Sequence, residues 1–303
     1  MQREGGAMTA AQASSGGYFV SKRRKQRIRK LVTWAGLTIG FIWFMYPLLW
    51  TIASSLKTYA DFNRIPPSVF PSEVRWQNYP DAWNRVPFGR FFINTTIITV
   101  VNIVGTLLSC TMVGYGFARL QFRGKSQAFA LMLSTMMLPW WVTLIPTYII
   151  FRQLGWIDTW LPLTVPAFFA SASSVFLIRQ FFLTLPRELD EAAELDGCSK
   201  LGILWRVLLP LMKPVLATIG IFTFIGNWNN YLQPLIYIHR WELFPISIGL
   251  QFLRQAVSAL VSEPIQGLVM AATVFTSLPL IIIFFLGQNY FVRGIALTGR
   301  TGT

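Results

Sequence analysis

The sequence predicts an all-α integral membrane protein with six transmembrane helices. Hydrophobic side chains make up 53% of the 303 residues and charged side chains only 13%, which is too apolar for a soluble globular domain. The few charges are also segregated, and they leave charge-free stretches near or above the length needed to cross a bilayer core of about 30 Å as helices. The expected spans are residues 31–56, 91–118, 126–151, 160–178, 214–239 and 264–292.

The N-terminal segment, residues 1–30, carries eight Lys and Arg residues. It is expected to form a basic cytoplasmic tail at anionic lipid, ahead of a six-helix transmembrane domain over 31–303. With this end inside, the inner segments hold most of the basic residues, as the positive-inside rule requires. We therefore expect a multi-pass plasma-membrane protein with both termini in the cytoplasm. Most of the net charge of +14 lies in the inner segments, where basic residues set the membrane topology and attract anionic lipid. Nucleic acid is therefore not an expected partner.

The segments around the second span differ in size. Residues 57–90 form the longest outer segment, and their prolines and aromatic residues predict an ordered cap that is too short to be a domain. The second span carries two amides, Asn94 and Asn102, which either contact a solute or bond neighbouring helices. A tight turn over residues 119–125 leads to the third span. Prolines inside the spans act either as hinges or as static kinks where the freed carbonyls find other partners.

The inner segment 179–213 has 35 residues and predicts a helical hairpin. Pro186 opens its first helix, whose early acidic residues suit the helix dipole, and Gly197 can end it. A second helix is expected from about Ser199, with Pro210 stopping it before the next span. One face of this second helix should hold Leu201, Leu204, Trp205 and Leu208.

The hairpin favours a docking surface for another protein. Ala192 and Ala193 let a partner backbone approach closely, while Glu191 and Glu194 can meet a basic rim. The alternative is an amphipathic hairpin that lies on lipid, but such helices favour Lys and Arg over acidic residues. The segment is too short to hold an ATPase domain, so a motor would have to reside on another chain.

The fifth span contains a cluster of amide and aromatic side chains. Its members are Asn227, Trp228, Asn229, Asn230, Tyr231 and Gln233. Burying so many amides is costly unless they hydrogen-bond or line water. Amides can bond sugar hydroxyls and aromatic faces can cover C–H surfaces, so we expect the cluster to line the substrate pathway. The alternative is that these groups bond neighbouring helices or face a partner subunit.

The spans contain no Asp, Glu, Lys or Arg, which disfavours an ion-coupled carrier and suits a neutral polar solute. The single histidine, His239, lies at a membrane edge, and the two cysteines, Cys110 and Cys198, are far apart along the chain. These residues predict neither a catalytic set nor a metal site.

The hairpin resembles the coupling loop of permease subunits from binding-protein-dependent ABC importers. The family motif reads E-A-A, three residues, G, nine residues, I-x-L-P, and this chain has Glu191-Ala192-Ala193, Gly197 and Val207-x-Leu209-Pro210 at the same spacing. The one departure is valine in place of isoleucine. Segments 179–182, 227–230 and 289–294 are similar to those of the carbohydrate branch, the maltose type. The resemblance extends from about Ile28 to the C-terminus.

The resemblance implies a type I ABC importer permease fold with a cytoplasmic coupling hairpin. The coupling residues would be Glu191, Ala192, Ala193, Glu194, Gly197, Leu209 and Pro210. The implied partners are a second permease subunit, expected to be a different chain, two ATPase subunits and an extracytoplasmic solute-binding protein. ATP and Mg²⁺ would bind the ATPase subunits, and no cofactor would bind this chain. The tail over residues 294–303 would contact the ATPase dimer.

We therefore expect a non-enzymatic permease subunit that moves a sugar or a related neutral polar solute into the cell by alternating access. A polyol or a glycerol-phosphate-like compound is included in this substrate class. The first alternative is an ion-coupled secondary carrier, and the second is a membrane scaffold that transports nothing.

Overall fold

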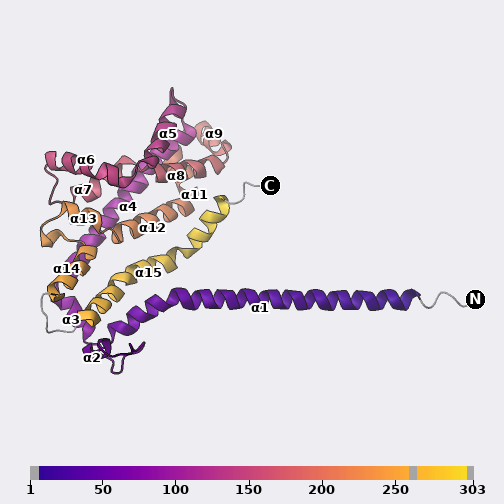
Figure 1. Ribbon diagram of the computed structural model, residues 1–303. Coiled ribbons are helices and arrows are strands. Elements are labelled where there is room, and N and C mark those ends of the chain that lie inside the picture. Colours follow the sequence, from indigo (N-terminus) through magenta and orange to yellow (C-terminus); the bar gives the residue numbers. More distant parts are fainter. Residues whose placement is uncertain (1–6, 259–264, 299–303) are drawn as a thin grey trace, which may run out of the picture.

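The computed structural model describes the backbone of residues 7–258 and 265–298, and the side chains of residues 25–255 and 266–288. Regular structure in this part of the chain is helical throughout (Figure 1). The longer helices are α1 (Ala7–Ser55), α3 (Asn78–Arg85), α4 (Phe88–Arg119), α5 (Lys125–Ser134), α6 (Trp140–Gln153), α8 (Ala172–Thr184), α9 (Glu188–Leu195), α12 (Lys213–Trp228), α14 (Ile246–Ser258) and α15 (Ile265–Thr298). The short ones are α2 (Tyr59–Phe62), α7 (Leu161–Thr164), α10 (Lys200–Gly202), α11 (Leu209–Leu211) and α13 (Leu232–Tyr237).

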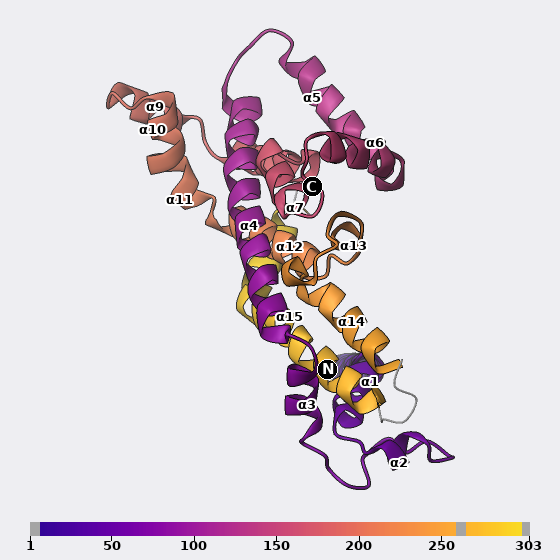
Figure 2. The same ribbon diagram turned by 90° about the vertical axis from the view of Figure 1, so that its left-hand side faces the viewer.

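Helix α4 is the axis of the bundle. Its 32 residues give a length of about 48 Å, which exceeds the apolar thickness of a bilayer. It packs against α8, α12 and α14. The hairpin helices α9 to α11 lie at one end of α4, and α2 and α3 lie at the other (Figures 1 and 2). We call these the hairpin end and the cap end.

Helix α1 stands apart from the bundle. The most apolar window of its membrane-length part, Lys25–Ser55, has no buried residue, and its main contacts are with α15. In Figure 1 it meets the other helices only near the cap end. Because α1 begins at Ala7, it also extends through most of the segment that the sequence assigns to a basic tail.

Four helical segments are long and apolar enough to cross a membrane, and two bent helix pairs raise the number to six within the described residues. The predicted third span, 126–151, is one of these pairs: α5 and α6 meet at an angle of 100°. The bend falls at Leu138–Pro139, where proline forces the preceding residue into an extended conformation. The predicted span is therefore two helices joined by a sharp bend, at one of the prolines that the sequence places inside the spans as hinges or kinks.

The predicted fifth span, 214–239, is also interrupted. Helix α12 ends at Trp228 and α13 begins at Leu232, so the expected amide cluster lies at and around a helix break. The sixth predicted span agrees with the apolar part of α15, Gln266–Gln288. Its first residue, 264, and the chain end, 299–303, lie outside the described residues, as do the side chains of 289–298.

The outer segment 240–263 is not a simple loop. It contains α14, which folds back against α4 and α15 and buries Ile246, Ile248 and Leu253. The contact is close at Gly249, where an added Cβ would lie 2.3 Å from the Phe91 ring. The sequence did not predict this amphipathic helix, because the charges in segment 240–263 are typical of a loop between two membrane spans.

The cap over residues 57–90 is ordered, as the sequence predicts. The Asn78 amide donates hydrogen bonds to the carbonyl oxygens of Ser55 (2.9 Å) and Lys57 (3.0 Å). The buried carboxylate of Asp61 accepts hydrogen bonds from the Ser72 hydroxyl, from the Ser72 N–H (3.3 Å) and from the Thr58 N–H (3.3 Å). The Ser72 hydroxyl is the largest cause that lowers the pKa of Asp61 below its ordinary value.

Because the folded-state pKa of Asp61 is lowered, the carboxylate stabilises the cap fully at neutral pH, and this contribution is lost as pH falls through the lowered pKa. We expect limited proteolysis of residues 62–74 with an acid-stable protease to accelerate in that acidic range. An Asp61→Asn variant should be cleaved faster at neutral pH. The matched control is Asp81→Asn, which affects a partly exposed 3.5 Å ion pair with Arg75 and an exposed hydrogen bond from Gln77 (3.2 Å) and should change little. Equal cleavage of both variants would contradict the assigned role of Asp61.

Candidate functional site

The first helix of the hairpin, α9, ends in a Schellman motif. The N–H of Cys198 donates to the Ala193 carbonyl (2.9 Å), and the N–H of Gly197 donates to the Glu194 carbonyl (3.0 Å). Gly197 has a φ of +79°, a left-handed conformation that favours glycine. The sequence-based role of Gly197 as the residue that ends this helix is confirmed.

The second half of the hairpin begins at Ser199, whose hydroxyl accepts the Gly202 N–H (3.2 Å) as an N-cap. A π-helical turn over Ile203–Leu208 follows, in which the Leu209 N–H bonds the Leu204 carbonyl. Proline at 210 supplies no N–H and its ring crowds the preceding turn, which accounts for the wider winding. Pro210 lies inside α11 and does not stop the helix; the chain bends by 81° after Leu211.

The apolar face of this second half differs from the predicted stripe. Leu204 and Leu208 are fully buried together with Ile203, whereas Leu201 and Trp205 are 57% and 43% exposed. The wider π-helical turn changes the angular spacing of side chains, so the ordinary helical period fails here. In α9, Ala193 is buried in the core of the hairpin end, while Ala192 is exposed. The two alanines of the motif therefore face different surroundings.

A polar anchor fixes the hairpin to α4. The guanidinium of Arg119, the last residue of α4, lies 3.2 Å from the Asp190 carboxylate, and both side chains are nearly buried at 6% and 14% exposure. Arg119 also donates to the Leu185 carbonyl (2.9 Å), and the Tyr115 hydroxyl donates to the Lys200 carbonyl (3.0 Å). Both halves of the hairpin are thus tied to the central helix.

The outward face of the hairpin is acidic and apolar. Glu191 is exposed and has no ion pair in the described part of the chain. Glu194 pairs with Lys200 of the same hairpin, and the hydrogen bond to its carboxylate raises the pKa of Lys200. Leu195 is 90% exposed beside these charges. This face is available for contact with another protein.

Two members of the fifth-span cluster pack within the bundle. Trp228 is buried, stacks on Phe224 at 5.2 Å and donates its indole N–H to the Thr276 carbonyl (3.0 Å). The Asn227 amide bonds the Thr223 carbonyl of its own helix (2.8 Å). The side chains of Asn94 and Asn102 in α4 likewise bond backbone carbonyls of neighbouring segments.

Two further members stabilise the helix break. The Asn230 amide donates to the Gln233 side chain (2.7 Å), and the Asn230 carbonyl accepts the Ser247 hydroxyl from α14 (2.7 Å). These bonds satisfy backbone and amide groups where α12 unwinds before α13.

Asn229 and Tyr231, together with Trp228, line a cavity of about 390 Å³ between the end of α12, α14 and α15. Its other polar walls come from outside the predicted cluster. They are Ser247, Gln251 and Arg254 of α14, and Thr273, Thr276 and Ser277 of α15. The sequence could have indicated these residues, because the three from α14 share one helical face at spacings of three and four, and so do the three from α15.

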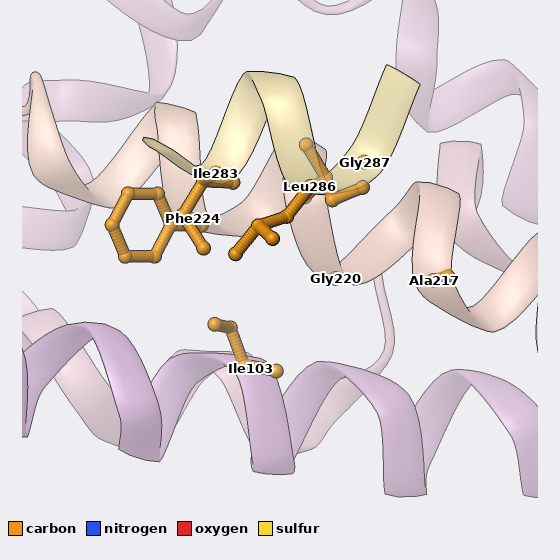
Figure 3. Close-up of a pocket in the computed structure, with 8 residues that line it drawn as sticks. Ile103, Ala217, Gly220, Phe224, Ile283, Leu286 and Gly287 are labelled. Carbon is orange, nitrogen blue, oxygen red and sulfur yellow. The ribbon is translucent and has the colours of Figure 1, made fainter. Parts of the chain in front are cut away.

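A second, apolar cavity of about 270 Å³ lies between α4, α12 and α15 (Figure 3). Ile103 of α4 faces Phe224, Ile283 and Leu286 across it. The lining is aliphatic and aromatic, so it offers no hydrogen bonds to the hydroxyls of a sugar.

The arrangement described so far, a membrane bundle with a rigidly attached hairpin at one end, is that of a transporter permease. Residues 110–297 match the family model for the binding-protein-dependent transport system inner membrane component. The chain belongs to this family.

Relatives extend the match over most of the chain. It is 36% identical over 275 residues to the probable ABC transporter permease protein YurM of Bacillus subtilis (strain 168), covering 90% of this chain and 89% of that protein. It is 33% identical to the arabinooligosaccharides transport system permease protein AraQ of the same organism, covering 86% and 91%. A crystal structure of a bacterial ABC transporter involved in the import of the acidic polysaccharide alginate matches with a TM-score of 0.79 at 26% identity, covering 88% and 98%.

These similarities confirm the predicted class: the chain is an all-α membrane permease component of an ABC importer, with the fold of that class. The family description also assigns such chains to the inner membrane.

Proposed function

We propose that this chain is one of two permease subunits of an importer for carbohydrate-like solutes, driven by ATPase subunits on separate chains. The names of the relatives support the solute class, since AraQ belongs to an arabinooligosaccharides transport system and the similar structure to an importer of alginate. The ATPase subunits would bind ATP and Mg²⁺, and this chain would bind no cofactor.

The observation that carries the coupling role is the contrast between the two faces of the hairpin. Its inner face is fixed to α4 through Arg119 and the fully buried Ile203 and Leu204. Its outer face exposes Leu195 together with the carboxylate of Glu191, and Trp205 in the second half of the hairpin is also exposed. Exposed apolar side chains rimmed by polar ones are typical of protein contacts.

The predicted coupling residues fit this division. Glu191 and Ala192 lie on the outer face, where Glu191 would pair with a basic residue of the ATPase. Gly197 shapes the turn, and Ala193 packs inward. Glu194 is held by Lys200. Leu209 and Pro210 form the connection toward α12, through which the hairpin would transmit its movement to the membrane helices.

Helix α1 favours a second permease subunit. Apart from its contacts with α15, its apolar surface is exposed: no residue of its most apolar window is buried, and Gly36 and Gly40 have open space where a Cβ would lie. A G-x-x-x-G pair in an apolar helix permits close approach of another helix. A second permease subunit would cover part of this face, and lipid would cover the rest. The second subunit would be a different chain.

The topology supports both termini on the cytoplasmic side. Helix α15 contacts α2 and α3 near its start, and α1 runs into α2. The C-terminal end of α1 and the N-terminal end of α15 therefore lie at the cap end, and their opposite ends would lie on the cytoplasmic side of the membrane. An extracytoplasmic solute-binding protein would meet the cap, where Phe70 and Trp76 are exposed.

In this scheme closure of the ATPase subunits moves the hairpin, and α4 carries the movement because Arg119 and Tyr115 tie the two together. The helices then expose the solute site alternately to either side. Coupling between two sites is reciprocal: if closure of the ATPase subunits changes the affinity for the loaded binding protein, binding of that protein must favour closure by the same free energy.

The test is reconstitution of the complete complex in liposomes, with radiolabelled oligosaccharides offered by the binding protein. Uptake should require ATP, the ATPase subunits and the binding protein, and should persist after ionophores collapse ion gradients. Uptake by this chain without the ATPase, or loss of uptake with ionophores alone, would support the secondary-carrier alternative. Absence of any uptake despite full assembly would favour the scaffold.

A further inference from the structure

The cavity of about 390 Å³ beside the helix break contains a charge that the predicted spans lack. Among the described residues that line it, Arg254 of α14 is the only charged one, and no carboxylate is present. The sequence places Arg254 in an outer loop, but α14 folds back and brings it to the cavity. Its volume falls within the range of about 300–1,000 Å³ that is usual for small-molecule sites.

One wall of the cavity offers hydrogen-bond acceptors. The hydroxyls of Thr273 and Ser277 donate to backbone carbonyls within α15, at 2.8 and 2.7 Å. The Ser247 hydroxyl donates to the Asn230 carbonyl. Because their protons are engaged, these hydroxyls present lone pairs to the cavity, and a solute hydroxyl can donate to them.

Donors come from Asn229 at the end of α12 and from the face of α14 that also carries Ser247. Asn229 uses one amide hydrogen toward the Ile225 carbonyl (3.0 Å) and retains a second. Gln251 provides a further amide. The Arg254 guanidinium interacts with another group of the chain, but it carries five N–H donors in a planar fork that matches a carboxylate or phosphate and can bond more than one acceptor.

We propose that this cavity is a substrate site of the permease and that Arg254 selects carbohydrate-like solutes bearing a carboxylate or phosphate group. The hydroxyl wall bonds the sugar or polyol body, and Arg254 pairs with the anionic group. This inference rests on the proposed function and narrows its substrate class from carbohydrate-like solutes to those that bear an acidic group, which departs from the neutral solute expected from the sequence. Trp228 contributes the apolar floor against which the carbon skeleton packs.

The test uses a cysteine reporter in the complete complex. Ser277→Cys places a thiol on the hydroxyl wall, and Cys198→Ser removes the one native thiol that is partly exposed, since Cys110 is fully buried. The rate of modification is measured with a negatively and a positively charged methanethiosulfonate reagent. One nearby positive charge should favour the negative reagent by about five- to tenfold. Arg254→Gln should abolish this preference, and Arg254→Lys should retain it.

Protection experiments then identify the ligand chemistry. D-galacturonate and glycerol 3-phosphate should slow modification, whereas D-galactose and glycerol should not, and Arg254→Gln should lose the protection. Nanodiscs of phosphatidylcholine and of phosphatidylglycerol separate a solute from a lipid headgroup as the anion. Three outcomes would each overturn the proposal. They are protection by phosphatidylglycerol alone, equal protection by neutral and acidic compounds, and an Arg254→Gln variant that keeps the reagent preference and the protection of the wild type. ATP-driven uptake would remain in all three cases, so these failures are distinct from failure of the proposed function.

Discussion

Replacing Asp190 by alanine is expected to detach the hairpin from α4 and to uncouple ATP hydrolysis from transport. The substitution leaves the Arg119 guanidinium nearly buried without its carboxylate. Breaking one partner of a buried ion pair costs on the order of 3–5 kcal/mol. Hydrogen exchange of residues 186–205 should accelerate, and ATP hydrolysis should no longer respond to the loaded binding protein.

The matched control is the exposed ion pair of the same hairpin. Glu194 and Lys200 are 46% and 59% exposed, so solvent screens the pair and Lys200→Ala should leave stability and exchange almost unchanged. A combined Arg119→Met and Asp190→Leu variant removes both charges and should recover part of the protection. If Asp190→Ala and Lys200→Ala behave alike, the buried anchor does not hold the hairpin.

Replacing Gly197 by valine should also impair coupling, for a different reason. At a φ of +79° a β-branched side chain clashes with its own backbone, and a non-glycine residue costs roughly 1–2 kcal/mol or more there. An added Cβ would have no atom of a non-adjacent residue within 4 Å, so the effect comes from the backbone conformation. Gly197→Asn should be close to neutral because asparagine tolerates this conformation.

Gly124 offers a matched control in the turn between α4 and α5. Its φ is +78° and it also has open space around it, so Gly124→Val carries a similar backbone strain. Both valine variants should lower thermal stability by a similar amount, while only Gly197→Val should reduce ATPase stimulation. Equal loss of stimulation in both would show that coupling follows global stability and not the hairpin turn.

The sequence predicts the membrane helices well where a span is one continuous apolar helix. The third and fifth spans show the limit, because hydropathy averages across Leu138–Pro139 and across the break at residues 229–231. The amides at the second break read as a pathway cluster, yet Asn230 and Gln233 bond each other to satisfy the unwound segment. Helix α14 was missed because a short amphipathic helix between two apolar spans, in a segment with charges at both ends, resembles a loop.

The hairpin could be predicted because its motif is local in the sequence. The Schellman turn at Gly197 follows from the preference of glycine for positive φ. The anchor between Arg119 and Asp190 could not be predicted, because the pair is distant along the chain and forms only when α4 and α9 pack together. Arg254 was missed for the same reason, since its role depends on where α14 folds.

The central claim, that the outer face of the hairpin holds the ATPase, is tested most directly by co-purification. The complex is isolated in detergent through a tag on this chain, and the amount of ATPase per permease is measured for wild type and for a Leu195→Asp, Trp205→Asp double variant. A Phe70→Asp, Trp76→Asp variant carries the same change at the opposite, cap end. We predict that the hairpin variant loses the ATPase while the cap variant keeps it. Retention of the ATPase by the hairpin variant, or equal loss in both, would contradict the account.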